Sequence, residues 1–582
     1  MFYRIASLMT AAFPLILAAV SALLFTRRRA VYALGPSGAW LAPAFLWSLW
    51  YAFLWLGHLA GSLAGAGTIA ALPLAASAYW AIRKTRPRRI YSRGLTAPDW
   101  TATTLIAACL IAQPTFNFET HIPLIETYLR GNVPPCDYND PAAPLNYHAL
   151  YSASAALFAK AFGFSADFAL DAVSIALLPA LLLSLHAAGR ALFKTERARQ
   201  AARLLFLFGL GPIYLRPGHP NEGYWFLHGW SNQSFVEAVL RPTAMLNLCV
   251  FSFLLAALLP RLPSRDIPGT GARRAPAPLW LLPAAFMLPQ ASEELAGLTG
   301  LAIIGLWLSG RFPGTWALGG IALAAGSAAT SGVVREVLFP RPGVPHPQLF
   351  LQWPPILLSW MGGNKPLFSW EAAKILFWEW GPVYAAALWA CKNDPRRRTG
   401  PLIFAICFGT ASSLVFGGDW SPQDLDRLFF YSTPFVFMLS ALWIEKLKLS
   451  RARSWALVLF CVLGPLACSL FRIHHFFSRP ETIAPFLRPP PSPLIAALAE
   501  VGPREQLVTD KAMARPLLLA GFVVASPPFF HENKNLLEKF EEHMAGFRRR
   551  PTWYFLPEND PRLAGLTATA SYKGRILART SP

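Results

Sequence analysis

Charged residues are scarce in this chain of 582 residues, and acidic residues are scarcer than basic ones. Only 14% of the residues are Asp, Glu, Lys or Arg, whereas soluble domains carry roughly 25%. Hydrophobic residues make up 54%, and the mean hydropathy is +0.38. This composition argues against a large soluble core. It predicts a polytopic membrane protein, because apolar runs of about 20 residues recur along the chain.

Cysteine is also sparse, and its spacing carries no pattern. The seven cysteines form no CxxC pair and no metal-ligand spacing, and most lie in apolar runs, where a free cysteine behaves as a small hydrophobe. Cys136 alone lies in a polar loop, and it has no obvious partner. The sequence therefore indicates neither a disulfide framework nor a zinc site.

The basic excess is distributed in short clusters between the apolar runs. A net charge of +21 can indicate a nucleic-acid partner, but clusters of this kind are typical of cytoplasmic loops in membrane proteins. We therefore expect a lipid bilayer, and no nucleic acid, as the partner of this chain. The clusters are 27–29, 83–89, 194–203, 261–274, 392–398 and 446–453.

Placing each basic cluster in the cytoplasm predicts the topology. The first apolar run, 5–25, lacks a small-residue cleavage site and is expected to be a retained helix. Counting crossings from there makes the loop 115–148 extracytoplasmic and predicts roughly 12 to 14 spans in all. Two helical patterns follow, 149–162 and 168–192. Only an odd number of membrane crossings leads from the extracytoplasmic loop to the cytoplasmic basic cluster 194–203. One of the two is therefore expected to be juxtamembrane or half-buried.

The composition changes from about residue 474. A proline-rich hinge, 485–493, precedes a stretch of ordinary polarity. Short strands are predicted at 506–510, 522–525 and 553–556, and helices at 494–501 and 535–548. The expected fold class is an all-α polytopic transmembrane bundle over 1–473, with a small α/β extracytoplasmic domain over 474–582. The expected location is the inner membrane of a bacterium.

The loop 115–148 concentrates polar and ionisable side chains between apolar runs. Ionisable groups at a membrane boundary indicate function. Glu119 and Glu126 are two helical turns apart, so both can share one face of a helix over 120–130 whose Leu124, Ile125 and Leu129 lie against the membrane. Either carboxylate can act as a general base, or both form a solvated helix face. The polar residues of the loop are Asn117, Glu119, His121, Glu126, Asp137, Asp140 and His148.

The two histidines of this loop have two interpretations. His121 and His148 can contact substrate or ligate a metal, or they are interfacial histidines satisfied by their neighbours.

Three short motifs in this loop carry a family resemblance: His121 itself, GNVPP at 131–135, and PLNYH at 144–148. With them, the loop resembles the first extracytoplasmic loop of the GT-C superfamily of membrane glycosyltransferases, which use polyprenyl-phosphate sugars. The resemblance implies inverting, mannosyltransferase-like transfer from such a donor to a glycan, lipid or protein acceptor.

The chain departs from the family at one position. The family usually carries Asp four residues before the histidine, and this sequence has Asn117 there. An asparagine cannot act as a base, which leaves Asn117 as a substrate contact. The catalytic role then falls to Glu119, the nearest carboxylate, or to Glu126 or a later loop. The remaining possibility is an inactive homologue.

Later loops add candidates for phosphate binding. Arg427 ends the loop 417–427 and opens an apolar helix. The resemblance implies that such an arginine faces the lipid phosphate, for which a guanidinium offers a bidentate fork. The alternative is an ion pair with Asp424 or Asp426. Lys365, in another outer loop, or a divalent metal such as Mg²⁺ or Mn²⁺ can assist.

One further turn carries acids inside an apolar stretch. The turn 290–294 contains Gln290 and two adjacent glutamates, Glu293 and Glu294. Adjacent acids are costly in an apolar setting unless they are paired or hydrated. They offer an alternative base or a metal or acceptor contact, or the turn is simply exposed to solvent.

Two other functions fit the same layout. A lipid-glycan polymerase, ligase or flippase would share the membrane topology, and a flippase would line a path with charged residues inside its spans. One long predicted helix carries four ionisable residues that meet this requirement: Asp167, Asp171, His186 and Arg190. A non-catalytic membrane subunit that binds a partner through the C-terminal domain is the third possibility, and Asn117 favours it.

Overall fold

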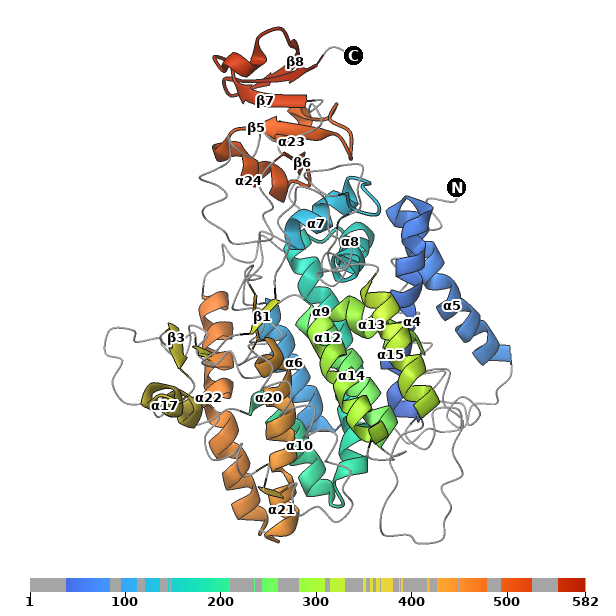
Figure 1. The fold of residues 1–582 in the computed structure, drawn as a ribbon, viewed down its shortest axis with the longest axis vertical. Coiled ribbons are helices and arrows are strands. Elements are labelled where there is room, and N and C mark those ends of the chain that lie inside the picture. Colours follow the sequence, from blue (N-terminus) through green and yellow to red (C-terminus); the bar gives the residue numbers. More distant parts are fainter. Residues whose placement is uncertain are drawn as a thin grey trace.

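The computed structural model is mostly helical, with a small sheet near the C-terminus (Figure 1). The description below is confined to the following residues: 38–83, 96–111, 121–136, 145, 149–209, 235, 243–259, 282–308, 314–329, 349–351, 356–359, 363–366, 368–379, 387, 389–390, 416–418, 427–448, 450–478, 493–525 and 553–580.

The helices of the bundle and their bounds are α4 (Gly38–Gly57), η1 (His58–Ala60), α5 (Leu63–Arg83), α6 (Ala97–Ile111), α7 (His121–Leu129), α8 (Leu150–Phe162), α9 (Ala166–Leu192), α10 (Glu196–Phe208), α12 (Ala244–Leu258), α13 (Leu282–Ala291), α14 (Glu293–Leu308), α15 (Gly314–Ala328), α17 (Trp370–Glu379), α20 (Arg427–Ser440), α21 (Leu442–Lys446) and α22 (Arg451–Phe477). Short strands between them are β1 (Leu349–Leu351), β2 (Ile356–Ser359), β3 (Gly363–Pro366) and β4 (Phe416–Gly418). Most helix bounds lie close to the apolar runs of the sequence.

Helix α9 is the central element of the bundle. It packs against α4, α6, α8, α10 and α12, and most of its side chains are buried. Ser165 caps its first turn, because the hydroxyl accepts a hydrogen bond from the backbone N–H of Phe168 at 3.3 Å. Its 27 residues correspond to about 40 Å of helix, enough to cross a bilayer.

Two helical segments among the described residues are long and apolar enough to cross a membrane, Trp40–Ala60 and Ala166–Leu192. Both are largely buried inside the protein. Helix α8 has only 13 residues and is viewed nearly along its axis in Figure 1, whereas α9 runs lengthwise. Of the two helical patterns at 149–192, α9 is thus the one with the length of a span. The full count of spans stays a prediction.

A buried ion pair joins α6 to α10. The Nε and Nη2 atoms of Arg203 donate to the two carboxylate oxygens of Asp99 at 2.7 and 2.9 Å. The Nη1 atom donates to Nδ1 of His186 on α9 at 3.0 Å. Since an arginine can only donate, the neutral His186 ring carries its proton on Nε2. Three helices therefore meet at one guanidinium.

This ion pair corrects the sequence-based view of the basic cluster 194–203. Arg203 was expected in a cytoplasmic loop. The structure instead buries Arg203, with 2% of its surface exposed, inside a helix that begins at Glu196. The reason is electrostatic: Asp99 neutralises the arginine, so the helix can carry it into the core.

The C-terminal domain is a five-stranded mixed sheet in the order β6-β5-β7-β9-β8. Strands β6, β5 and β7 are parallel, and β9 and β8 are antiparallel to their neighbours. The elements are α23 (Pro493–Ala497), β5 (Gln506–Thr509), α24 (Lys511–Leu519), β6 (Val523–Val524), β7 (Trp553–Pro557), η8 (Pro561–Leu563), β8 (Thr567–Tyr572) and β9 (Arg575–Arg579).

The predicted α/β character of this domain is confirmed. Strands β5, β6 and β7 lie where the sequence predicts strands, and α23 begins the predicted helix at 494–501. The sequence analysis missed α24, β8 and β9. The predicted helix at 535–548 lies outside the described residues.

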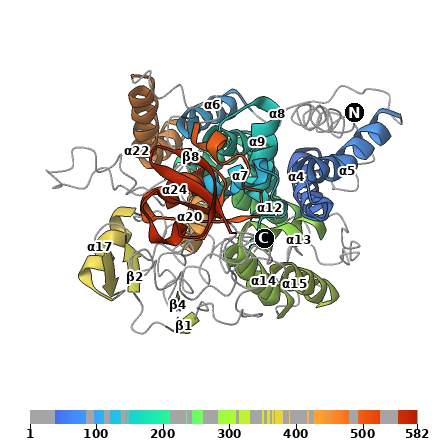
Figure 2. The same cartoon turned by 90° about the horizontal axis from the view of Figure 1, so that it is seen from above.

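The sheet domain lies at the end of the bundle where α7 and α8 are found (Figures 1 and 2). Helix α24 contacts α7, and α22 runs from the end of the bundle near α21 toward the end that carries the sheet domain (Figure 1). The first polar loop and the C-terminal domain thus meet at one end, while the Asp99–Arg203 pair lies deeper in the bundle.

We expect Arg203→Met to lower the free energy of unfolding by about 3–5 kcal/mol, because it leaves the Asp99 carboxylate buried without a counter-charge. The double variant Asp99→Leu, Arg203→Met should recover most of that loss. Denaturant unfolding of the full chain in detergent measures both. Equal losses in the single and double variants would contradict the role given to the ion pair.

Candidate functional site at the junction of the first loop and the C-terminal sheet

Helix α7 is enclosed by protein on both sides. Leu124 and Ile125 are fully buried, and Leu129 packs against the main core. The expectation that these side chains lie against the membrane is therefore wrong for Leu124 and Ile125, whereas Leu129 is half-buried. The physical reason is that α7 contacts α8 of the bundle and α24 of the C-terminal domain. The apolar side chains of α7 therefore pack against protein.

His121 begins α7 and is buried, with 1% of its surface exposed. Its Nδ1 lies 3.0 Å from the Ser152 hydroxyl on α8, and its ring meets Tyr151 edge-on. Tyr151 in turn donates to the backbone carbonyl of Leu170 on α9 at 3.0 Å. In this geometry His121 matches the alternative of a histidine satisfied by neighbours, and its contact with substrate stays a prediction.

Tyr128 ties α7 to the end of the first described helix. Its hydroxyl is hydrogen-bonded to Nε2 of His58 at 2.8 Å, and the two rings are stacked with their centroids 5.7 Å apart. Burial raises the pKa of Tyr128 well above its usual value. The phenol is therefore a neutral hydrogen-bonding group that holds α7 in place.

Glu126 lies half-buried on α7, at the face that meets the C-terminal domain. One turn later, Arg130 donates from Nη2 to the backbone carbonyl of Val501 at 2.8 Å. The Arg130 guanidinium also lies 3.7 Å from the ring centroid of Phe522. Burial lowers the pKa of Arg130, and the nearby Glu126 carboxylate acts in the opposite direction. Glu126 is thus coupled electrostatically to a cation that reaches into the sheet domain.

The turn 131–136 belongs to the C-terminal domain as much as to the bundle. Asn132 is fully buried, and its Nδ2 donates to the Cys136 sulfur at 3.1 Å. Cys136 is buried among the apolar side chains of the sheet domain, next to residues such as Val501 and Leu507. The one polar-loop cysteine noted in the sequence is therefore a core residue of a domain more than 350 residues later in the chain.

Arg504 of the C-terminal domain binds this turn at three points. Its Nε donates to Oδ1 of Asn132 at 3.1 Å. Its Nη2 donates to the backbone carbonyls of Val133 and Pro134 at 2.8 and 3.1 Å. One guanidinium thus recognises three consecutive residues of the Gly-x-x-Pro-Pro motif.

Gly521 provides the closest approach between the two parts. A Cβ atom at this position would lie 2.4 Å from the backbone carbon of Glu126. Its φ of +79° also belongs to the region that favours glycine. The Thr127 hydroxyl completes the contact by donating to the Gly521 carbonyl at 3.5 Å.

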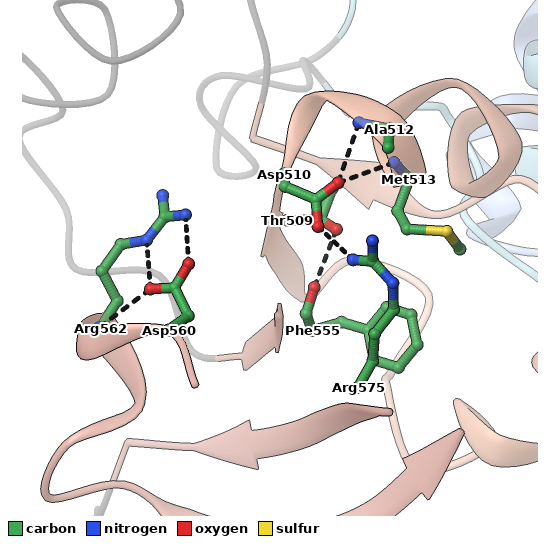
Figure 3. Close-up of polar contacts among 8 residues, drawn as sticks. All are labelled: Thr509, Asp510, Ala512, Met513, Phe555, Asp560, Arg562 and Arg575. Atoms are coloured by element: carbon green, nitrogen blue, oxygen red, sulfur yellow. Dashed lines mark hydrogen bonds and ion pairs between the residues drawn. The ribbon is translucent and has the colours of Figure 1, made fainter. Parts of the chain in front are cut away.

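The opposite, carboxyl-terminal edge of the parallel strands is stabilised by local ion pairs (Figure 3). Asp510 caps α24 by accepting from the backbone N–H of Ala512 and Met513 at 2.9 and 3.1 Å, and it pairs with Arg575. Asp560 pairs with Arg562 at 2.8 Å, and this hydrogen-bonded arginine holds the pKa of Asp560 below its usual value. These contacts join α24 to β9 and close the turn after β7.

The later candidate residues lie partly within the described residues. Arg427 is the first residue of α20, which confirms that it opens a helix. Lys365 lies in β3, opposite Leu357 of β2. Strands β1 and β4 pair antiparallel, so residues 349–351, which precede the β2–β3 pair, lie beside residues 416–418, which precede α20.

Residues 290–292 of the turn 290–294 are buried. Gln290 is buried and donates from Nε2 to the carbonyl and hydroxyl oxygens of Ser327 at 2.8 and 3.1 Å. This residue therefore ties α13 to α15.

Several predicted site residues lie outside the described residues, namely Asn117, Glu119, His148, Asp424, Asp137 and Asp140. Their roles stay predictions. No group of three or more His, Cys, Asp or Glu residues forms a possible metal site within the described part of the chain, and the structure therefore assigns no ligand to the expected Mg²⁺ or Mn²⁺.

Sequence reasoning missed the residues that bring the loop and the domain together: Arg130, Gly521 and Arg504. Each lies in an ordinary-looking turn or helix end, and their partners lie more than 350 positions away in the sequence. The one available signal was Cys136, an apolar side chain without an apparent partner in a polar loop.

No protein-family model, no curated protein and no solved structure matches this chain.

We expect Gly521→Ala to destabilise the docked domain more than Gly565→Ala does. Both glycines have φ near +80°, but a Cβ at Gly565 meets nothing within 4 Å. The shared backbone strain costs about 1–2 kcal/mol, and overpacking against α7 adds about 1–3 kcal/mol only at Gly521. Denaturant unfolding of the two purified variants measures the difference, and equal losses would contradict the close contact with Glu126.

Proposed function

We propose that this chain is a multi-pass membrane glycosyltransferase of the GT-C type. It moves a sugar from a polyprenyl-phosphate donor to an acceptor hydroxyl at the extracytoplasmic face. The observation that carries the proposal is the junction: an ionisable first loop with GT-C-like motifs is held between an apolar helical bundle and a separate sheet domain. One of the family motifs, GNVPP at 131–135, lies in the segment that the sheet domain binds.

The surface of α22 supports the membrane part of the proposal. Its outward side chains Leu459, Phe460, Leu463 and Leu470 are each about half exposed, at 54, 46, 54 and 55%. The buried side chains of the same helix include Ser454, Val458, Cys461, Val462 and Ser469. An exterior at least as apolar as the interior is not typical of a soluble helix and suits a lipid environment. Exposed Arg451 and Arg453 at one end suit a cytoplasmic boundary.

The proposed reaction needs one base and one cationic site. A carboxylate of the first loop, Glu119 with Glu126 as the alternative, takes the proton of the acceptor hydroxyl. The acceptor oxygen bonds to the anomeric carbon as the bond from that carbon to the phosphate oxygen breaks, which inverts the configuration. The polyprenyl phosphate leaves with the electron pair of the broken bond.

Arg427 is proposed to stabilise the departing phosphate. Its position at the start of α20 suits this role, because a helix N-terminus and a guanidinium both favour an anion. Lys365 of β3 is a second candidate, because its ammonium can pair with a phosphate oxygen. His148 and Asp424 are kept as proposed substrate contacts. No step here depends on a metal.

A non-catalytic role is the second candidate, and Asn117 favours it. In that case the loop retains the family motifs but has lost its base, and the sheet domain binds a partner. Activity of the wild-type chain itself separates the two candidates.

We expect Glu119→Gln to reduce sugar transfer by about a hundredfold or more, the usual contribution of a general base. Glu126→Gln should reduce it less, because Glu126 is half-buried and coupled to Arg130. The assay is transfer from a polyprenyl-phosphate sugar in membranes that contain each variant at equal abundance. Full activity of Glu119→Gln would overturn its assignment as the base, and an inactive wild type would favour the non-catalytic role.

The topology makes a separate prediction. Protease added to the extracytoplasmic side of intact cells should cleave the exposed hairpin formed by β8 and β9, whereas protease confined to the cytoplasmic side of inverted vesicles should not. Immunoblotting for a C-terminal tag reads the result. Cleavage from the cytoplasmic side alone would overturn the proposed orientation.

A further inference from the structure

We infer that the C-terminal sheet domain is a clamp that sets the position of the first loop, and that Arg504 is the positioning residue through which it acts. The activity consequence rests on the proposed function, whereas the clamp itself is tested independently of activity. The inference assigns a role to a domain for which the sequence suggested only partner binding.

The clamp has a stiff base. Arg504 lies in the turn 502–505 immediately before β5. The Glu505 carboxylate accepts from the Gly502 backbone N–H and from the Trp553 indole, both at 2.7 Å. Because Trp553 belongs to β7, the turn that presents Arg504 is fastened to the centre of the sheet.

The segment that the clamp holds, residues 132–134, accepts its side-chain hydrogen bonds from Arg504. Asn132 is fully buried, and Arg504 donates to its Oδ1 and to the next two carbonyls. Loss of this donor would leave a buried amide oxygen unsatisfied, which is costly. A lysine cannot replace the fork, since its ammonium is a single point donor group on a flexible stem.

The contact is reciprocal and includes a shared core. Arg130 reaches from the loop side to Val501 and Phe522 of the domain. Cys136 inserts among the domain's buried apolar residues and is itself only 3% exposed. Cations from both sides and a common apolar cluster thus fix the two ends of the 130–136 segment.

The position of the clamp connects it to the proposed chemistry. Glu126 lies one helical turn before Arg130, and α7 begins two residues after Glu119. Holding the exit of α7 therefore restricts where the loop carboxylates can lie. Small displacements of a catalytic group can cost about a hundredfold in rate, so a clamp at this point is expected to act on the chemical step.

Cys136 offers a direct probe of the clamp. We expect its thiol in the full-length wild type to react slowly with a membrane-impermeant maleimide, quantified by mass spectrometry of the Cys136 peptide. Arg504→Ala should accelerate this labelling by roughly tenfold or more, because hydrogen bonds that keep the turn closed are lost. Arg504→Lys should restore little protection. Arg562→Ala, a matched arginine of the same domain that pairs with Asp560, should label like the wild type.

Fast labelling of the wild type, or unchanged protection in Arg504→Ala, would overturn the clamp. If the wild type transfers sugar, Arg504→Ala should lower kcat by about tenfold to a hundredfold with little change in the KM for the donor. A purely stabilising contact would leave kcat per folded enzyme unchanged and would overturn the positioning role. An inactive wild type with slow Cys136 labelling that Arg504→Ala accelerates would reject the proposed function and retain the clamp.

Discussion

Hydrogen bonding by guanidinium groups that join distant parts of the chain is the interaction on which the arrangement of this protein depends. In an apolar bundle an arginine cannot be left without acceptors, because an unpaired buried charge is far more costly than a surface one. Arg203 satisfies this demand with Asp99 and His186, and in doing so fixes α6, α9 and α10 relative to one another. The helices that carry these three residues cannot shift independently.

Arginines also join the parts of the chain at the other end, but there Arg130 is half-buried, Arg504 is exposed, and the acceptors are neutral. Arg130 and Arg504 cross the junction in opposite directions and bind backbone carbonyls and one amide oxygen. A hydrogen bond to a carbonyl oxygen depends on direction, because the oxygen has to lie along the N–H bond of the guanidinium. Such contacts therefore select one geometry of the loop. The junction thereby recognises the shape of the loop backbone. It is tight at Gly521, where only a hydrogen fits against α7.

This arrangement alters the view of the C-terminal domain. Its amino-terminal strand edge docks on the first loop, and Cys136 of the loop belongs to its core. Its carboxyl-terminal edge carries the pairs Asp510–Arg575 and Asp560–Arg562 (Figure 3). The domain is therefore part of the proposed catalytic end of the protein, held there by contacts that span most of the chain.

The sequence by itself determined the local elements of this protein: most helix positions, three strands of the C-terminal sheet and the polar character of the first loop. These follow from hydrophobic periodicity and composition, which act over a few residues. Only the tertiary structure decided that Leu124 and Ile125 face protein rather than lipid, that Arg203 is buried, and that Arg504 binds the Pro-Pro turn. Those outcomes depend on which distant residues pack over an apolar face or accept a hydrogen bond. No local pattern in the sequence specifies a partner more than 350 residues away.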